Sequence, residues 1–176
     1  MSFNILKLKL KKAILNFLGY NIKLRIGRNV RIDNFVKIKL CKNSKLFIGD
    51  NVYIGRLCFI GVYNNAELYL GKGVHLSQGV IISCHESIKI RRNSIIGYYS
   101  FLGDGDHSKP VFKFSKINSK PIEIEENVWL ATRVTVLKGT KIGKNSIIGA
   151  GTVIANRIIP ENSTCINQLN LKVKGG

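Results

Sequence analysis

The sequence predicts an all-β fold: a parallel β-helix of about six turns with an N-terminal amphipathic helix and one long corner loop. The first observation is a period of six, seen in the aliphatic residues Ile124, Leu130, Val136, Ile142, Ile148 and Ile154. The second is that earlier repeats come in groups of three, and the third is that the extra residues always follow the third repeat of a group. An α-helix does not keep one face at a strict period of six, and a simple strand repeats every two residues, whereas hexapeptides that form the sides of a coiled prism repeat every six.

Residues 1–22 form the first predicted unit, a basic amphipathic helix, and are the only part with a helical pattern. The apolar face is predicted to consist of Phe3, Leu6, Leu10, Ala13, Ile14 and Phe17, with Lys7, Lys9, Lys11 and Lys12 lying off it. The lysines interrupt any apolar run and no small-residue cleavage site follows, so neither a signal peptide nor a membrane span is expected. Two roles are compatible with the pattern: a cap on the open end of the coil, or residues 1–20 resting on an anionic membrane.

Residues 23–176 form the second predicted unit, the β-helix itself. Its early inward residues are the triplets Ile26, Ile32, Ile38; Ile48, Ile54, Ile60; Leu70, Leu76, Ile82; and Ile90, Ile96, Leu102. The spacing between successive triplets is 10, 10, 8 and finally 22 residues, which predicts a long extruded loop at about 103–121. Glycine often follows the inward aliphatic residue, as at Gly49 and Gly97, and we interpret it as a requirement of tight corners.

Charge and cysteine content limit the partners and the compartment. The chain of 176 residues has 28 Lys and Arg against 10 Asp and Glu, a formal net charge of +18, which indicates anionic partners. Residues 1–45 hold twelve of the basic residues and the single acidic residue Asp33. The four cysteines form no CxxC pair, which favours a reduced, cytoplasmic protein. The sequence shows neither an array of aromatic residues for base stacking nor a recognition helix, so a nucleic-acid partner is not expected.

The residues that can carry acid–base chemistry are few. An imidazole, with a reference pKa of about 6.5, suits proton abstraction, and the chain has only His75, His85 and His107. His107 lies in the long loop after two Asp-Gly steps, where no aliphatic repeat residue would bury it, so a general base and an exposed loop histidine are both compatible. Asp104 and Asp106 can orient the imidazole or contact an acceptor, but Asp-Gly pairs are also common in turns.

The segments GDGDHSKP and KPIEIEENVWLATRVTVLKGTKIGKNSIIGAGTVIANRIIPENS are specific enough to indicate a family. Over about residues 24–174 the sequence resembles the hexapeptide-repeat acyltransferases, in the branch of the maltose and galactoside acetyltransferases and the polysaccharide O-acetyltransferases. The resemblance implies a left-handed β-helix, a homotrimer, acetyl-coenzyme A as co-substrate and active sites in clefts between adjacent coils. It also implies that His107 is the general base.

The same resemblance implies roles for other residues. Trp129 would face the acyl-donor cleft, although an outward tryptophan can also belong to a trimer interface. The residues expected to approach coenzyme A are Ala131, Thr132, Gly149, Ala150, Arg157 and Lys172, where Arg157 replaces the lysine that the family usually has nearby. The residues expected near the acceptor are Ser77, His85, Asp104 and Asp106, with a solvated corner as the alternative for His85. No metal ligand is expected.

The function that this resemblance implies is transfer of an acetyl group from acetyl-coenzyme A to a sugar hydroxyl of a bacterial surface glycan. The net charge suits an acidic acceptor. Three alternatives remain: N-acetylation of an amino sugar or antibiotic, a zinc hydratase in which all three histidines converge on a metal, and a non-catalytic, charge-driven scaffold. Thiol release from acetyl-coenzyme A that depends on His107 separates the acyltransferases from the other two.

Overall fold

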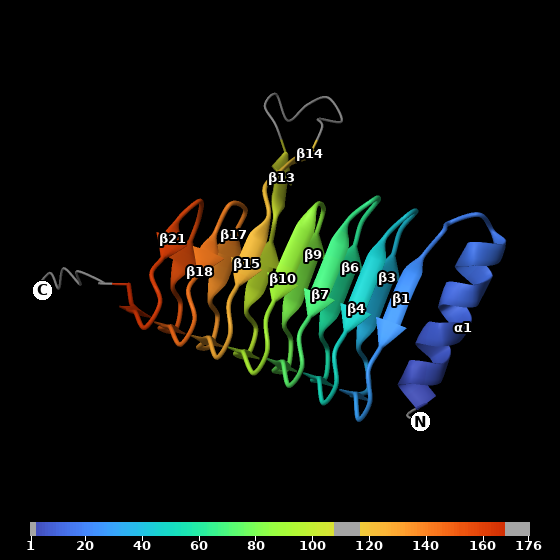
Figure 1. The fold of residues 1–176 in the computed structure, drawn as a ribbon, viewed down its shortest axis with the longest axis horizontal. Helices are drawn as coiled ribbons and strands as arrows, with labels where there is room; N and C mark the ends of the chain where they lie inside the picture. The colour runs from blue at the N-terminus through green and yellow to red at the C-terminus, as the bar shows by residue number, and fades with distance from the viewer. Residues whose placement is uncertain (1–2, 108–116, 168–176) are drawn as a thin grey trace, which may run out of the picture.

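The computed structural model describes residues 3–107 and 117–167, in which the strands wind into a three-sided column (Figure 1). Sheet A contains β1 (Lys23–Ile26), β4 (Lys45–Ile48), β7 (Glu67–Leu70), β10 (Ser87–Ile90), β15 (Ile122–Ile124), β18 (Lys141–Ile142) and β21 (Ile158–Ile159). Sheet B contains β2 (Arg31–Ile32), β5 (Tyr53–Ile54), β8 (His75–Leu76), β11 (Ile95–Ile96), β16 (Trp129–Leu130), β19 (Ile147–Ile148) and β22 (Thr164–Cys165). Sheet C contains β3 (Lys37–Leu40), β6 (Phe59–Val62), β9 (Ile81–Cys84), β12 (Phe101–Gly103), β17 (Thr135–Leu137) and β20 (Val153–Ile154).

Each turn of the column passes from sheet A to sheet B to sheet C, and we name the corners A–B, B–C and C–A after the sheets that they join. Six complete passages, given by the six strands of sheet C, confirm the predicted parallel β-helix of about six turns. The inward residues stack in register, as Leu102 does between Ile82 and Val136. All three are fully buried, so the hexapeptide pattern correctly identified the core.

Asparagine occupies most of the left-handed positions at the A–B corner. Asn93, Asn127, Asn145 and Asn162 have φ between 57° and 58°, a conformation that asparagine adopts more easily than most residues. Their amides form a ladder, with Nδ2 to Oδ1 distances of 3.4 Å from Asn93 to Asn127, 3.1 Å from Asn127 to Asn145 and 3.0 Å from Asn145 to Asn162. This ladder ties successive turns together at the solvent edge of the column.

The corner glycines meet a different requirement from the one expected. Gly49 and Gly97 do not have a positive φ, but a Cβ added at Gly97 would lie 2.4 Å from the carbonyl oxygen of Ala131 in the next turn. At Gly49 the same added atom would lie 2.7 Å from the backbone nitrogen of Lys72. Glycine is therefore needed at these two positions for the close stacking of turns, and the positive φ falls two residues later.

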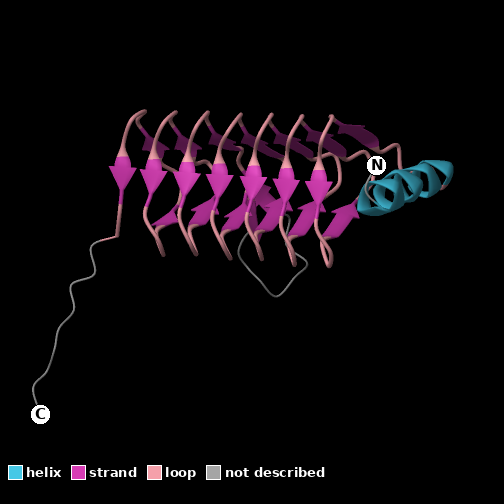
Figure 2. Cartoon of the chain, turned by 90° about the horizontal axis from the view of Figure 1, so that it is seen from below, coloured by secondary structure: helices cyan, strands magenta, loops and turns pink. Residues whose placement is uncertain are grey.

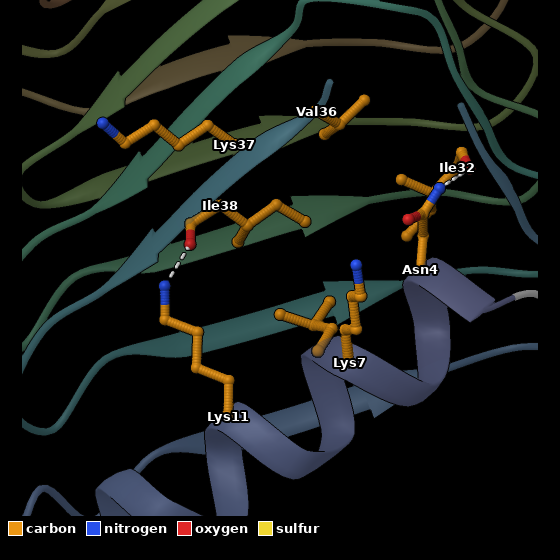
Figure 3. Close-up of a pocket in the computed structure, with 8 residues that line it drawn as sticks. Asn4, Lys7, Lys11, Ile32, Val36, Lys37 and Ile38 are labelled. Carbon is orange, nitrogen blue, oxygen red and sulfur yellow. Dashed lines mark hydrogen bonds between the residues drawn. The ribbon is translucent and has the colours of Figure 1, made fainter. Parts of the chain in front are cut away.

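Helix α1 (Phe3–Phe17) lies across the N-terminal end of the column, beyond the first turn (Figure 2). It meets the column with Ile5 and Leu8, which are buried, and with Leu15, which packs partly against the core. Asn4 donates from Nδ2 to the carbonyl oxygen of Ile32 at 2.8 Å, and Lys11 donates from Nζ to that of Ile38 at 2.7 Å (Figure 3). The helix thus supplies hydrogen-bond donors to carbonyl groups that no preceding turn could reach.

The apolar face predicted for the helix is not the face that packs against the column, so that prediction was wrong. Leu6, Leu10, Ile14 and Phe17 are 51%, 60%, 52% and 92% exposed, respectively. At 100° per residue they lie on the side of the helix opposite Ile5, Leu8 and Leu15. The helix therefore has two apolar stripes, one that covers the column and one that faces outward.

The long insertion emerges from the C–A corner as a hairpin of β13 (Gly105–His107) and β14 (Ile117–Ser119), which projects from the column (Figure 1). This agrees with the loop predicted at about 103–121. Within residues 3–107 and 117–167, no helix is long and apolar enough to span a membrane.

Candidate active site

His107 is presented by the projecting hairpin. It is the last described residue of β13, it pairs with Ile117 of β14, and its side chain is exposed. Because β13 and β14 pair antiparallel over Gly105–His107, the backbone up to the histidine is held rigidly away from the column. The imidazole is therefore accessible to a reactant outside its own column.

Asp104 anchors the base of the hairpin and is fully buried. Its Oδ1 accepts a hydrogen bond from the backbone N–H of His85 at 2.6 Å, and its Oδ2 accepts from Glu86 at 2.9 Å and Ser87 at 2.7 Å. These three amides form the C–A corner of the preceding turn, so Asp104 joins the start of the hairpin to that corner. Both oxygens of its carboxylate accept hydrogen bonds in this network. Asp104 was expected near the acceptor, and these contacts support a role in positioning the hairpin instead.

His85 lies directly beneath the hairpin. Its ring stacks on Tyr63, with centroids 4.2 Å apart and planes at 5°, and its Nε2 lies 3.1 Å from the Ser83 hydroxyl. A Cβ added to Gly105 would lie 3.1 Å from the His85 ring and side chain, so the glycine is needed for this close approach. Burial lowers the pKa of His85 below its ordinary value of 6.5, the Asp104 charge acts against this, and the nearby His107 adds to it.

Asp106 fixes the hairpin to a later turn. Its carboxylate forms an ion pair with Lys138 Nζ at 2.6 Å, and the same ammonium donates to the carbonyl oxygen of Asn118 at 3.3 Å. Lys138 follows β17, one turn after the hairpin leaves the column. Asp106 and Asn118 sit on the two paired strands, so one lysine contacts both of them. Asp104 and Asp106 thus hold the hairpin that carries His107 from opposite sides.

Four of the six expected coenzyme A residues lie at a different corner, whereas Arg157 lies at the C–A corner. Ala131, Thr132, Gly149 and Ala150 lie in two successive B–C turns. An open cavity of about 540 Å³ there is lined by Tyr98, Tyr99, Thr132, Arg133, Ala150 and Gly151. Small side chains leave backbone groups open, as an extended pantetheine arm requires, and Arg133 supplies a cation for a phosphate. Two of the expected residues, Thr132 and Ala150, line this cavity.

The B–C corner also carries large side chains in an unfavourable backbone conformation. Phe35, Leu57, Tyr99 and Arg133 have φ between 55° and 62°, in the left-handed region where the A–B corner uses asparagine. Such a conformation costs roughly 1–3 kcal/mol for a bulky residue and persists only where the surrounding structure fixes it. The B–C corner therefore presents large side chains at the positions where the A–B corner has asparagine.

Trp129 points outward from sheet B and is 49% exposed, as expected from the sequence. It pairs in register with Ile95 on one side and Ile147 on the other, and both of these side chains are also exposed. Together they form an apolar strip on sheet B beside the B–C corner. An exposed strip of this kind suits contact with another surface.

The expected residues do not form one site within the chain. His107, His85, Asp104, Asp106 and Arg157 are at the C–A corner, and the donor-side residues are at the B–C corner. Sheet C separates the two corners, and its strand β9 of four residues spans roughly 13 Å. Lys172 lies outside the described residues.

Ser77 lies at the B–C corner, in a second open cavity of about 360 Å³ that also involves Arg31, Tyr53, Arg56, His75 and Tyr98. Apart from Ser77, sequence reasoning did not link these residues to the site. A usable signal existed: Arg31, Tyr53 and His75 are spaced by 22 residues, which is one turn of the β-helix, so they stack in register on sheet B.

The three histidines do not converge within the chain, because His75 is on sheet B while His85 and His107 are at the C–A corner. Across the part of the chain that the structure describes, no cluster of three or more His, Cys, Asp or Glu side chains could hold a metal ion. The arrangement that the zinc hydratase alternative requires is therefore not found in these residues.

Comparisons with known proteins agree with the fold. A model of the family described as "Bacterial transferase hexapeptide (six repeats)" matches residues 121–156. Galactoside O-acetyltransferase of Lactococcus lactis is 54% identical over 44 residues, which are 25% of this chain and 21% of that protein. WbbJ of Escherichia coli, described as a candidate O-acetyltransferase of lipopolysaccharide biosynthesis, is 35% identical over 97 residues, 48% of each protein. The chain thus aligns with about half or less of these relatives.

Among solved structures, a hexapeptide-repeat acetyltransferase of Vibrio cholerae in complex with acetyl-coenzyme A superposes with a TM-score of 0.58 at 17% identity. The superposition covers 90% of this chain and 73% of that one, which extends the agreement in fold well beyond the matched repeats. The repeat model matches residues 121–156, and the shared column covers nearly all of the chain. The chain therefore carries the hexapeptide repeats of this bacterial transferase family over residues 121–156 and is similar in fold to a hexapeptide-repeat acetyltransferase.

Proposed function

We propose that the protein transfers an acetyl group from acetyl-coenzyme A directly to a sugar hydroxyl of a bacterial surface glycan, with His107 as the general base. The observation that carries this proposal is the exposed histidine on a hairpin that two carboxylates, Asp104 and Asp106, hold against the column. The surface-glycan acceptor is supported by the likeness to WbbJ, which is described as acting in lipopolysaccharide biosynthesis.

The reaction needs one base and no covalent enzyme intermediate. His107 accepts the proton of the sugar hydroxyl while the hydroxyl oxygen forms a bond to the thioester carbonyl carbon. The carbon–sulfur bond then breaks, the proton passes from His107 to the departing sulfur, and the products are the O-acetyl sugar and free coenzyme A. The B–C cavity would hold the co-substrate, with Ala131, Thr132, Gly149 and Ala150 leaving room for the pantetheine arm and Trp129 beside the acyl end.

A homotrimer is part of the proposal. The base and the donor cavity lie at different corners of one column, so a second copy would bring the hairpin of one subunit to the B–C corner of the next. The apolar strip of Ile95, Trp129 and Ile147 on sheet B supports burial between subunits. Sheet A instead carries charged pairs, such as Arg91 with Glu125 at 3.0 Å and Lys141 with Glu125 at 3.3 Å, which suit a face that remains in water.

The test is thiol release from acetyl-coenzyme A in the presence of acidic and neutral bacterial glycans, with wild-type protein, His107→Ala and the control Lys89→Ala. Lys89 is an exposed residue on sheet A and lines neither cavity of the B–C corner. We expect glycan-dependent turnover that falls by roughly 100-fold or more in His107→Ala and stays unchanged in the control. Equal turnover in His107→Ala and wild type would overturn the assignment of the base. Failure to bind coenzyme A at all would overturn the enzyme proposal.

We also propose a cytoplasmic protein that rests on the anionic inner face of the membrane through helix α1. The outward apolar stripe of the helix, with Leu6, Leu10 and Ile14 half exposed or more, is bordered by lysines, and the helix contains no acidic residue. Apolar side chains flanked by cations match a bilayer that contains anionic lipid. This placement would bring the enzyme to the surface at which membrane-linked glycans are assembled.

A further inference from the structure

A column of polar and aromatic side chains runs along the N-terminal half of sheet B, beside the B–C corner. Arg31, Tyr53 and His75 occupy the same outward position in three successive turns and pair in register. The Tyr53 and His75 rings are 4.6 Å apart, and the Arg31 guanidinium carbon lies 5.6 Å from the centre of the Tyr53 ring. Arg56 reaches the same cavity from the B–C corner, where it lies 5.9 Å from the centre of the Phe35 ring.

The two arginines of this cavity have no carboxylate partner at ion-pair distance among the described residues. Most acidic side chains of the column are paired with cations elsewhere: Asp50 with Arg28, Glu126 with Arg92 and Glu161 with Lys144. The one carboxylate that lines the cavity, Asp33, accepts a hydrogen bond from the Tyr53 hydroxyl at 2.6 Å. Two guanidinium groups against one carboxylate leave the cavity with a net positive charge.

Both guanidinium groups are exposed, and each lies over an aromatic ring. The Tyr53 hydroxyl in turn donates a hydrogen bond to Asp33. Arginine held over an aromatic ring loses less side-chain freedom when it binds an anion, and its planar group matches the oxygens of a carboxylate or a phosphate. This is a more specific arrangement than scattered surface lysines provide.

The cavity adjoins the proposed donor cleft. Tyr98 lines both cavities, and Ser77, expected near the acceptor, is 93% buried in the wall of the arginine-containing one. The two cavities therefore follow one another along the B–C corner, with the arginines toward the N-terminus and Ala150 toward the C-terminus. A glycan bound at the first cavity would extend toward the acyl end of a co-substrate bound at the second.

We infer that the cavity of Arg31, Tyr53, Arg56, His75, Ser77 and Tyr98 binds an anionic substituent of the acceptor glycan, a carboxylate or a phosphate ester. The inference rests on the proposed acetyltransferase function and adds the chemical class of its acceptor. Arg31 and Arg56 form charge-assisted hydrogen bonds to the anion, and His75 and Ser77 bond to neighbouring hydroxyls. The acetylated hydroxyl then belongs to a sugar unit next to the charged one. Neutral glycans lack the charged contact that would fix which sugar unit lies beside the co-substrate.

The experiment compares Arg31→Gln and Arg56→Gln with the control Arg28→Gln, which removes the same charge at the A–B corner. The probes are an oligomer of glucuronic acid, the same oligomer with its carboxyl groups reduced to alcohols, and mannose 6-phosphate. Binding is measured by calorimetry, and acetyl transfer is measured by thiol release. One of the two anionic probes will bind the wild type more tightly than the other. We expect the affinity of Arg31→Gln and of Arg56→Gln for that probe to be lower by roughly tenfold or more, and the affinity of the control to equal that of the wild type.

The two anionic probes distinguish the two kinds of anion. Tighter binding of the oligoglucuronate indicates a site for a carboxylate, and tighter binding of mannose 6-phosphate indicates a site for a phosphate. If both anionic probes bind the cavity variants as tightly as the wild type, the inference is overturned. Equal turnover of the carboxylated and reduced oligomers would also overturn it, while the proposed function would stand. If anion binding is lost in the variants but no glycan is ever acetylated, the acetyltransferase proposal fails and the anion site remains.

Discussion

The Lys138 ammonium joins Asp106 on one strand of the hairpin to the Asn118 carbonyl group on the other. We predict that Lys138→Ala lowers the rate of acetyl transfer by roughly tenfold or more, because small displacements of a catalytic group cost large factors. Stability should change by less than about 1 kcal/mol, since Asp106 is 61% exposed and such ion pairs are weak. Steady-state kinetics and thermal melts measure both quantities.

The control is Lys144→Ala, which removes an exposed ion pair with Glu161 at the A–B corner, away from the hairpin. Lys138→Arg should restore most of the activity, since arginine can make both contacts. A variant Lys138→Ala with wild-type kcat would mean that the clamp does not position His107.

Asp104 is predicted to be a major determinant of stability at the C–A corner. Asp104→Asn keeps the shape but replaces one acceptor oxygen with an NH₂ group that faces backbone N–H donors. Because the side chain is fully buried, we expect a loss of about 2–4 kcal/mol in the free energy of unfolding. Urea denaturation measures the change. Asp50→Asn, which alters a partly exposed carboxylate bonded to the backbone N–H of Arg28, should have a smaller effect. Equal effects would argue against the burial of the Asp104 network.

The proposed composite site predicts complementation between two inactive variants. His107→Ala lacks the base, and Ala150→Trp fills the donor cavity. If the base of one subunit serves the cavity of the next, trimers reassembled from an equal mixture should recover roughly a quarter of the wild-type rate, since one interface in four is intact. Light scattering checks that the mixture is trimeric, and thiol release measures the rate. No recovery in mixed trimers would place the base and the cavity of each site in the same subunit.

Membrane docking by α1 predicts a lipid-dependent partition. Leu10→Ser combined with Ile14→Ser removes two outward side chains that do not contribute to the buried side of the helix. We expect the variant to bind vesicles containing phosphatidylglycerol roughly tenfold more weakly or worse, with the same melting temperature as the wild type. Co-sedimentation measures the partition, and Ile158→Ser, exposed on sheet A, is the matched control. Unchanged sedimentation of the double variant would exclude this stripe as the docking face.

The histidine environments predict a dependence of stability on pH. Burial lowers the pKa of His85 below 6.5, so at mildly acidic pH the unfolded chain binds a proton that the folded chain does not. Stability from this group is therefore fully present above about pH 6.5 and is lost as the pH falls below that value. His75, whose pKa is lowered mainly by burial and further by Arg31, has the same sign. The difference between the urea midpoints at pH 7.5 and pH 5.5 should be smaller in His85→Gln than in the wild type. The same difference in both proteins would contradict the role given to His85.

Much of the candidate site was readable in the linear sequence because of the period. The spacing of 22 residues between Leu102 and Ile124 located the hairpin, and the GDGDHSKP segment identified His107 as a candidate base. The role of Asp104 could not be read there. An Asp-Gly step is compatible with an exposed turn, and only the approach of the His85, Glu86 and Ser87 amides gives its carboxylate three donors.

The packing face of the helix could not be predicted from the sequence either. Leu6, Leu10 and Ile14 fit one apolar face as well as Ile5, Leu8 and Leu15 fit another, so hydrophobic periodicity alone could not select the face that packs. The end of the column selects the packing face, because its carbonyl groups require donors such as Asn4 and Lys11, which lie on the side of the buried Ile5 and Leu8.

The sequence by itself determined the column: a period of six fixes which side chains point inward, and burial of those aliphatic residues drives the coil whatever lies outside it. Tertiary structure decided which contacts the outward side chains make. The spacing of 22 residues places Arg31, Tyr53 and His75 in one outward row, but only the folded column brings Arg56, Ser77 and Tyr98 beside them in one cavity. Outward side chains are free of the packing constraint that makes the core periodic, so their function depends on which neighbours the turns bring beside them.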